Sequence, residues 1–194
     1  MFGGMATARF LPEELLLRDR RQARSRVAII TALQYSEARS DTLLHALQLF
    51  KLDVRGKSVL LKPNLVEYIP GVEVNTNPVL VSAAAEALLQ LGAKRVVVGE
   101  GPGHQRDTHL VLVESGLDTQ LRSQGIEFVD LNRDELVKVR TRANFTGLDH
   151  LWLPRTVLTS DFIVSMPKIK THHWAGVTLS MKNMFGVEIG RAHV

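Results

Sequence analysis

The sequence predicts an α/β domain built around a mostly parallel β-sheet with helices on both faces, a layering of the Rossmann type. From Val27 onward, short apolar runs alternate with segments of helical periodicity, and this alternation with short connections is typical of parallel sheets. The 194 residues are 45% hydrophobic and 23% charged, as in one ordinary globular domain. The chain has no cysteine, which excludes a disulfide scaffold, a thiolate metal site and any iron–sulfur cluster held by the chain itself.

Five apolar runs are expected to form strands. The run RVVVG at 95–99 is rich in β-branched residues, as a strand that is buried on both faces requires. The second run is cut by Pro63 and the last is ended by Pro167. The five predicted strands are Val27–Ile30, Ser58–Leu61, Arg95–Gly99, Ile126–Leu131 and Phe162–Ser165.

Helical patterns fill the gaps between these strands. The clearest start signal is Asn77-Pro78, because asparagine caps free N–H groups and proline fits the first helical turn. That helix is expected to run as far as Leu91 and to stop at Gly92. The other helices expected in this part of the chain begin at Ser40 or Asp41 or lie within 107–115 and 117–123.

Two further stretches have their own patterns. Residues 132–154 alternate irregularly and fit either an antiparallel β excursion or a small lid. From Trp174, apolar residues recur at helical spacing, which predicts a helix with Thr178 and Lys182 on one shared face. Such a stripe is more typical of a core with a polar edge than of a cofactor site.

The charge distribution argues against nucleic acid as a partner. The net charge is +4, but residues 1–26 carry six arginines against three acidic residues and so account for +3 of it. Four of those arginines lie within Arg20–Arg26 with no aromatic residue among them, so the stacking platform of single-strand binders is missing. We expect 1–26 to be an Arg-rich extension and 27–188 to be a single α/β domain.

No segment predicts export or a membrane span. Leu15-Leu16-Leu17 is too short for the apolar region of a signal peptide and lies between acidic and basic residues. No uncharged apolar run approaches the roughly 18 residues that cross a bilayer. We therefore expect a cytoplasmic protein without a membrane partner.

The chemically distinctive residues come directly after strands. Lys62 and Asn64 follow the second apolar run, and Glu100 follows the third. Asn132 follows the fourth run, and Lys168 and Lys170 follow the last. The carboxyl ends of parallel strands share one edge of the sheet, and ligands bind there. We therefore expect these residues to line one crevice.

The loop after the last strand carries the strongest of these signals. Lys168 and Lys170 are two residues apart, so in extended backbone both side chains project to the same face. Two ammonium groups so placed repel one another unless an anion or an acid lies between them, and the window Ser165–Asn183 contains no acidic residue. A carboxylate or phosphate ligand is the economical explanation, and two solvated lysines on an exposed loop are the alternative.

Three residues are candidates for proton transfer. Glu100 and Lys168 are preferred, and His172 is held in reserve. The loop Gly99–Gly103 matches neither a Walker loop nor a dinucleotide fingerprint, which leaves a phosphate cradle or a plain tight loop. No metal is assigned, because adjacent residues such as His172-His173 rarely direct both rings to one ion.

Three segments carry a resemblance to a known family. In order they are VLLKPNLV (59–66), NTNPVLVSAAAEALLQLGAKRVVVGEGPG (75–103) and SDFIVSMPKIKTHHWAGVTLSMKNMFG (160–186). Together they resemble the family called domain of unknown function 362, which is widespread in bacteria and archaea and has no established general reaction. Matched residue by residue, the resemblance implies a site formed by Lys62, Asn64, Asn77, Glu100, Lys168, Lys170, Thr171, His172, Lys182 and Asn183.

The resemblance also bears on cofactors and on the C-terminus. Some family members carry a ferredoxin-like module with four-iron clusters; a [4Fe–4S] cofactor would here belong to a fused module or to a separate chain. The family pattern continues beyond Gly186, whereas this chain soon ends. Residues 189–194 can be encoded by a short-read sequencing adapter, so we expect a non-native tail and a domain that is incomplete at its C-terminus.

The preferred hypothesis is an enzyme, or a fragment of one, that binds an anionic small molecule in a lysine-lined crevice. Catalytic roles are expected for Glu100, Lys168 and His172. The alternative is a redox-associated partner of a ferredoxin-type module. The expected ligand-binding residues are Lys62, Asn64, Asn77, Lys168, Lys170, Thr171, Lys182 and Asn183.

Overall fold

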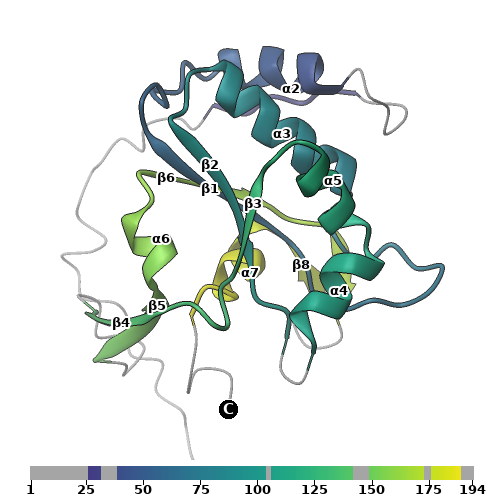
Figure 1. Cartoon of the computed structure of the whole chain (residues 1–194), viewed down its shortest axis with the longest axis vertical. Helices are drawn as coiled ribbons and strands as arrows, with labels where there is room; N and C mark the ends of the chain where they lie inside the picture. Colours follow the sequence, from purple (N-terminus) through teal and green to yellow (C-terminus); the bar gives the residue numbers. More distant parts are fainter. Residues whose placement is uncertain (1–25, 32–38, 104–105, 142–148, 173–175, 189–194) are drawn as a thin grey trace, which may run out of the picture.

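The centre of the computed structural model is a four-stranded sheet in the order β3-β2-β1-β6, with every neighbouring pair parallel (Figure 1). The α/β class predicted from the sequence is confirmed. The strands are β1 (Ser58–Pro63), β2 (Arg95–Glu100), β3 (Glu127–Asp130) and β6 (Phe162–Met166). The structure describes residues 26–31, 39–103, 106–141, 149–172 and 176–188. The predicted extension up to residue 25, His173 and the suspected tail 189–194 lie outside these ranges.

The direction of strand addition changes at β1. The chain places β2 on one side of β1 and β3 beyond it, and it then returns to place β6 on the other side of β1. Connections that leave neighbouring strands in opposite directions open a crevice beyond the carboxyl ends of those strands. The topology therefore predicts a binding crevice at the carboxyl ends of β1 and β6.

Helices cover both faces of the sheet, with α3 and α5 on one side and α6 and α7 on the other (Figure 1). The larger core includes Val59, Leu61 and Val98, which point to the same face and are fully buried. Burial of such side chains is the main favourable contribution to folding. The helices that contribute to this core are α2 (Arg39–Gln48), α3 (Pro78–Gln90), α4 (Thr108–Glu114) and α5 (Leu117–Ser123).

The opposite face carries a smaller core of Leu60, Leu131 and Val157, the last from α6 (Arg155–Thr159). Packing here is close because β2 has a glycine. A Cβ atom on Gly99 would lie 2.8 Å from Leu60 Cδ1 and 3.1 Å from Leu131 Cδ2. A side chain at this position would therefore force Leu60 or Leu131 to shift.

Local signals predicted most elements well. The side chain of Asn77 accepts a hydrogen bond from the Val79 N–H at 3.0 Å, and α3 begins at Pro78, as predicted. The predicted helices within 107–115 and 117–123 are also present. The strand predicted at Val27–Ile30 is wrong: the segment forms no strand, and Val27 and Ile29 are 81% and 94% exposed, so the apolar run buries almost nothing.

The irregular stretch 132–154 contains an antiparallel ribbon, which confirms the β excursion. β4 (Leu136–Arg140) pairs with β5 (His150–Pro154) in a sheet separate from the parallel one. An ion pair between Glu135 and Arg155 connects the start of β4 with α6. The ribbon lies away from the carboxyl ends of the central strands (Figure 1).

The helix predicted from Trp174 is wrong. A hairpin takes its place, in which β7 (Lys170–His172) pairs antiparallel with β8 (Gly176–Thr178). A right-handed helix cannot pass through Gly176, whose φ is +71°. The helix α7 (Ser180–Phe185) begins only after β8, so Thr178 and Lys182 do not share a helix face.

Within the part of the chain that the structure describes, no helix combines the length and the apolar character that crossing a bilayer requires.

Candidate functional site

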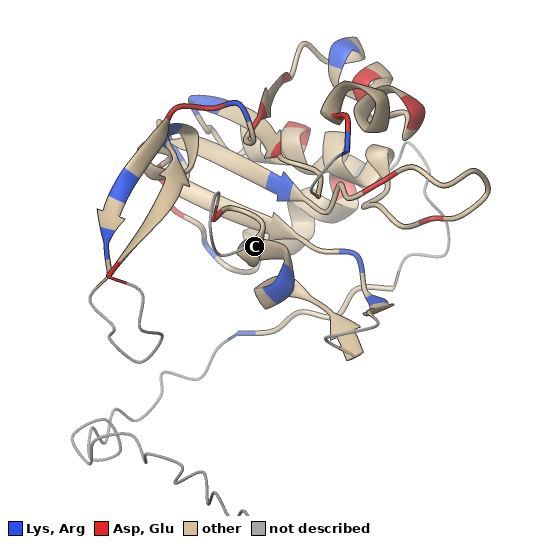
Figure 2. Ribbon diagram, turned by 90° about the horizontal axis from the view of Figure 1, so that it is seen from below, with Lys and Arg blue, Asp and Glu red and all other residues tan. Residues whose placement is uncertain are grey.

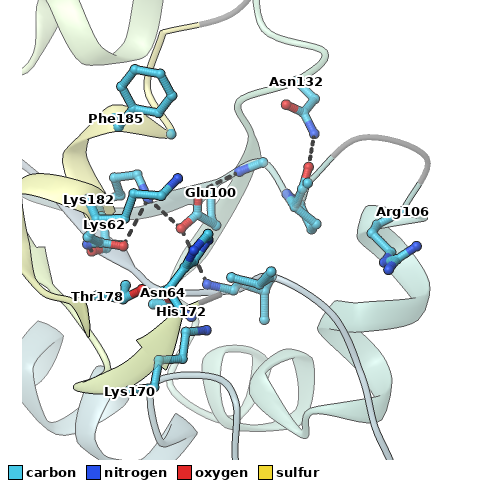
Figure 3. Close-up of a pocket in the computed structure, with 17 residues that line it drawn as sticks. Lys62, Asn64, Glu100, Arg106, Asn132, Lys170, His172, Thr178, Lys182 and Phe185 are labelled. Carbon is cyan, nitrogen blue, oxygen red and sulfur yellow. Dashed lines mark hydrogen bonds and ion pairs between the residues drawn. The ribbon is translucent and has the colours of Figure 1, made fainter. Parts of the chain in front are cut away.

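A pocket of about 630 Å³ lies beyond the carboxyl ends of the central strands (Figure 3). Its walls come from the carboxyl ends of β1 and β2, from the loops after β1, β2 and β3, and from β7, β8 and α7. The pocket lies beside the switch in strand order between β1 and β6, where the topology predicts a crevice. The predicted site residues that line the pocket are Lys62, Asn64, Glu100, Lys170, His172, Lys182 and Asn183.

Lys62 and Glu100 form a buried ion pair in this pocket (Figure 3). Lys62 is 1% exposed and Glu100 is 3% exposed. The Lys62 ammonium also donates to Pro63 O and to Asn183 Oδ1, both at 3.3 Å, so each of its three N–H groups has an acceptor. Burial lowers the pKa of Lys62 and raises the pKa of Glu100, and the attraction between the two charges opposes both shifts.

The carboxylate of Glu100 is held from several sides. Its Oε2 accepts from Lys62 and from the Leu65 N–H at 3.3 Å, and its Oε1 accepts from the Gly101 N–H at 3.0 Å. Gly186 lies beside the pair: a Cβ atom there would be 3.6 Å from Lys62 Nζ and 3.7 Å from Glu100 Oε1. Since glycine has no side chain, Gly186 does not fill the space on this side of the ion pair.

Asn183, from α7, fixes the ion pair to two strands. Its Nδ2 donates to Lys62 O at 3.0 Å and to Ser165 Oγ at 2.9 Å. Its Oδ1 accepts from the Lys62 ammonium. All three contacts are internal to the protein, so Asn183 links α7 to β1 and β6 and orients Lys62.

Asn64 and Asn77 hold the loops beside the pocket. The Asn64 N–H donates to Thr76 Oγ1 at 2.9 Å, and Thr76 Oγ1 donates to Met166 O at 2.6 Å. Asn64 Nδ2 donates to Val74 O at 3.2 Å. These bonds join the segment after β1 to the end of β6. Asn77 does not line the pocket, and its side chain is used to cap α3.

Lys170 and Lys182 supply positive charge to the pocket. Lys170 is partly buried and donates to Val74 O at 2.8 Å, and burial lowers its pKa. Lys182 Nζ lies 5.0 Å from the centre of the Phe185 ring, a cation–π contact. The described ribbon from β6 to α7 carries basic positions and no acidic one (Figure 2).

Lys168 and Thr171 do not line the pocket. Lys168 forms an ion pair at 3.2 Å with Glu73, which is 95 residues earlier in the chain. Lys168 precedes β7, so the two lysines predicted to share a face do not lie in one strand. Thr171 occupies the alternate position between Lys170 and His172, and it is exposed on the other face of the hairpin.

Thr178 is a lining residue that sequence reasoning missed. It is 3% exposed, and its Oγ1 has no hydrogen-bond partner among the described residues. It lies directly opposite Lys170 in the β7–β8 hairpin. The signal that could have found it is the period of two in this hairpin, which the expected helix concealed.

Arg106 is a second lining residue that was missed, whereas Asn132, expected at this edge of the sheet, does line the pocket. Arg106 forms an ion pair with Glu67 at 2.9 Å, beside the loop after β2. Asn132 Nδ2 donates to Pro102 O at 2.9 Å (Figure 3), and a Cβ atom on Gly101 would overlap the Asn132 side chain. No group of three or more His, Asp or Glu side chains that could hold one metal ion occurs among the described residues.

The fold and the pocket define an α/β domain with a lysine-lined pocket at the carboxyl ends of its parallel strands, beside the switch in strand order. The chain belongs to the family described as Domain of unknown function (DUF362), whose model matches residues 59–193. It is also similar to the Thylakoid-associated protein sll1697 of Synechocystis sp., with 30% identity over 139 residues. The matched region is 70% of this chain and 40% of that relative, so the chain spans less than half of the relative's length. No solved structure matches the chain significantly.

Proposed function

We propose that the chain binds an anionic small molecule, through a carboxylate or phosphate group, and acts as an enzyme or part of one. One observation carries the proposal: Lys170 and Lys182 line the pocket without an ion pair to any described residue, whereas the lining carboxylate, Glu100, is already paired with Lys62. The described lining therefore has an excess of positive charge. Ammonium groups in a concave, partly desolvated site attract anions more strongly than they do at an open surface.

Glu100 is the proposed group for proton transfer. Burial raises the pKa of Glu100, and a carboxyl group with a raised pKa exchanges protons closer to neutral pH. Lys62 would stabilise the ionised form, and Asn183 would keep Lys62 in place. His172 lines the same pocket and is the second candidate for proton transfer. Lys168 can join the site only when its ion pair with Glu73 opens.

A thermal-shift experiment on the full chain tests anion binding. The ligands are inorganic phosphate, malonate and citrate, each compared with sodium chloride at equal ionic strength. We expect at least one anion to raise the Tm of the wild type, because a ligand that binds only the folded chain stabilises it. The double variant Lys170→Ala/Lys182→Ala should lose that rise.

Lys94→Ala is the matched control, because Lys94 is an exposed lysine at the amino end of β2, on the opposite edge of the sheet. It should keep the full rise in Tm. Lys168→Ala should keep it too, as long as Lys168 remains paired with Glu73. An equal rise in the double variant, or a rise matched by sodium chloride, would count against the proposal.

The alternative function, a redox-associated partner of a ferredoxin-type module, has its support in the family resemblance alone. A cytoplasmic location likewise stays a prediction. The name of the relative from Synechocystis sp. associates that protein with thylakoids, so fractionation of cells that produce the full-length protein is the measurement that decides between the cytoplasm and a membrane fraction.

A further inference from the structure

We infer that the hydroxyl of Thr178 is a ligand-binding group and that Thr178 and Lys170 together form the subsite for one oxygen atom of an oxyanion. The inference rests on the proposed anion binding and goes beyond it, because it names the wall of the pocket at which the anionic group is recognised.

The register of the β7–β8 hairpin brings the two side chains together. Lys170 and Thr178 are direct partners across the antiparallel pair, and such partners project from the same face with Cβ atoms about 4.5–5.5 Å apart. His172 lies two residues further along β7, opposite Gly176. Figure 3 shows Lys170, His172 and Thr178 gathered at the pocket, and all three line it.

The Thr178 hydroxyl is chemically unsatisfied in this wall. The side chain is nine-tenths buried or more, and Oγ1 has no hydrogen-bond partner among the described residues. Buried hydroxyl groups are normally bonded, because an unpaired one loses the hydrogen bonds that it made with water. Valine has nearly the same shape, so packing alone does not explain a hydroxyl at this position.

The neighbouring charge indicates which kind of group completes the bonding. A hydroxyl can donate and accept, whereas an ammonium group only donates. Lys170 uses one of its three N–H groups on Val74 O, which leaves the others for an acceptor. An anionic oxygen can accept from Lys170 and from Thr178 at once. Because Oγ1 lies within the wall, the β7–β8 hairpin must shift slightly to bring the hydroxyl into contact with a ligand oxygen.

Calorimetric titration of the full chain with inorganic phosphate and, separately, with malonate tests this subsite. We expect Thr178→Val to raise the Kd of the bound anion about tenfold, as loss of a hydrogen bond to a charged acceptor does. Thr178→Ser keeps the hydroxyl and should bind nearly as the wild type does. Thr171→Val is the matched control, because Thr171 is in the same hairpin but faces away from the pocket.

The ligand-free chain gives a second and independent readout. Removing an unpaired buried hydroxyl should leave the Tm of Thr178→Val equal to or above that of the wild type. A lower Tm would show that the hydroxyl already has a structural partner, and it would overturn the inference. A loss of affinity confined to phosphate or to malonate would support the subsite and identify the anion.

The two proposals fail in different ways. If the wild type binds neither anion beyond the ionic-strength control, the proposed function fails and the Thr178 subsite fails with it. If the wild type binds, the Lys170→Ala/Lys182→Ala variant does not, and Thr178→Val binds as the wild type does, anion binding stands and the Thr178 subsite alone is wrong.

Discussion

Lys62 and Glu100 join neighbouring parallel strands through an ion pair that is almost completely buried. Taking both charges out of water is costly, and apolar residues of similar volume often serve stability equally well. The pair is nonetheless surrounded by bonds that orient it, from Asn183, Leu65 and Gly101. An arrangement of that kind supports the proposed chemical role of the pair, and the same bonds also hold neighbouring strands together.

Replacing only one member of the pair should be strongly destabilising. We expect Lys62→Met to lower the free energy of unfolding by about 3–5 kcal/mol, because Glu100 is left as an uncompensated buried charge. Urea denaturation measures the loss. The double variant Lys62→Met/Glu100→Leu should recover much of it, and a double variant less stable than Lys62→Met would contradict this account.

The loss of unfolding free energy caused by Lys62→Met should grow as the pH rises. Burial raises the pKa of Glu100 above its ordinary value of 4.5, and Lys62 opposes that rise. Without Lys62 the folded-state pKa is higher still, so between 4.5 and that pKa the unfolded chain binds fewer protons than the folded chain. The free energy of unfolding therefore falls as pH rises through this window.

Urea denaturation of the wild type and Lys62→Met across the acidic to neutral range checks the sign. The difference between them should be smallest near the ordinary pKa of glutamate and larger at neutral pH. The Lys62→Met/Glu100→Leu variant should differ from the wild type by a less pH-dependent amount. A Lys62→Met deficit that does not change with pH would argue that Glu100 is not the titrating group.

Gly186→Ala should impair the site without damaging the fold. The new methyl group would lie 3.6 Å from Lys62 Nζ and 3.7 Å from Glu100 Oε1, and the φ of –70° at Gly186 suits alanine. We expect stability equal to the wild type or higher by about 0.4–1 kcal/mol. The anion-induced rise in Tm should shrink if the ligand reaches the pair by this side; an unchanged rise would place the ligand elsewhere in the pocket.

Gly99→Ala should be destabilising for steric reasons. Its methyl group would lie 2.8 Å from Leu60 Cδ1, in the smaller core. Overpacking of this kind costs about 1–3 kcal/mol, measurable by urea denaturation. Gly103→Ala is the control, because among the described residues, its chain neighbours aside, no atom lies within 4 Å of a Cβ there. Equal stabilities of the two variants would show that the core relaxes freely around Gly99.

The elements that the sequence predicted well depend on interactions within a few residues. The Asn77 cap and Pro78 act on the first turn of α3, so their effect can be recognised locally. Val27–Ile30 has the composition of a strand, but a strand also needs a partner and a buried face, and neither is a local property.

The site was predicted only in part, because some of its residues are placed by the ends of the strands and others by contacts with distant segments. Residues at or just after the carboxyl ends of parallel strands meet at one edge, which correctly grouped Lys62, Glu100 and Lys170. The acid-free window around Lys168 did not reveal Glu73, because that carboxylate comes from a distant loop. Thr178 was hidden because a helical period was assumed where the chain forms a hairpin.

The central position of β1 has a consequence for biosynthesis. Its partner β6 lies roughly 100 residues later, so a ribosome adding about 5–20 residues per second leaves one edge of β1 unpaired for roughly 5–20 s. Unpaired strand edges invite association between nascent chains, and a lysine in such an edge discourages it. Lys62 lies in this strand, so we expect the charge that ends up buried in the pocket to discourage association of the unfinished sheet while the rest of the chain is being made.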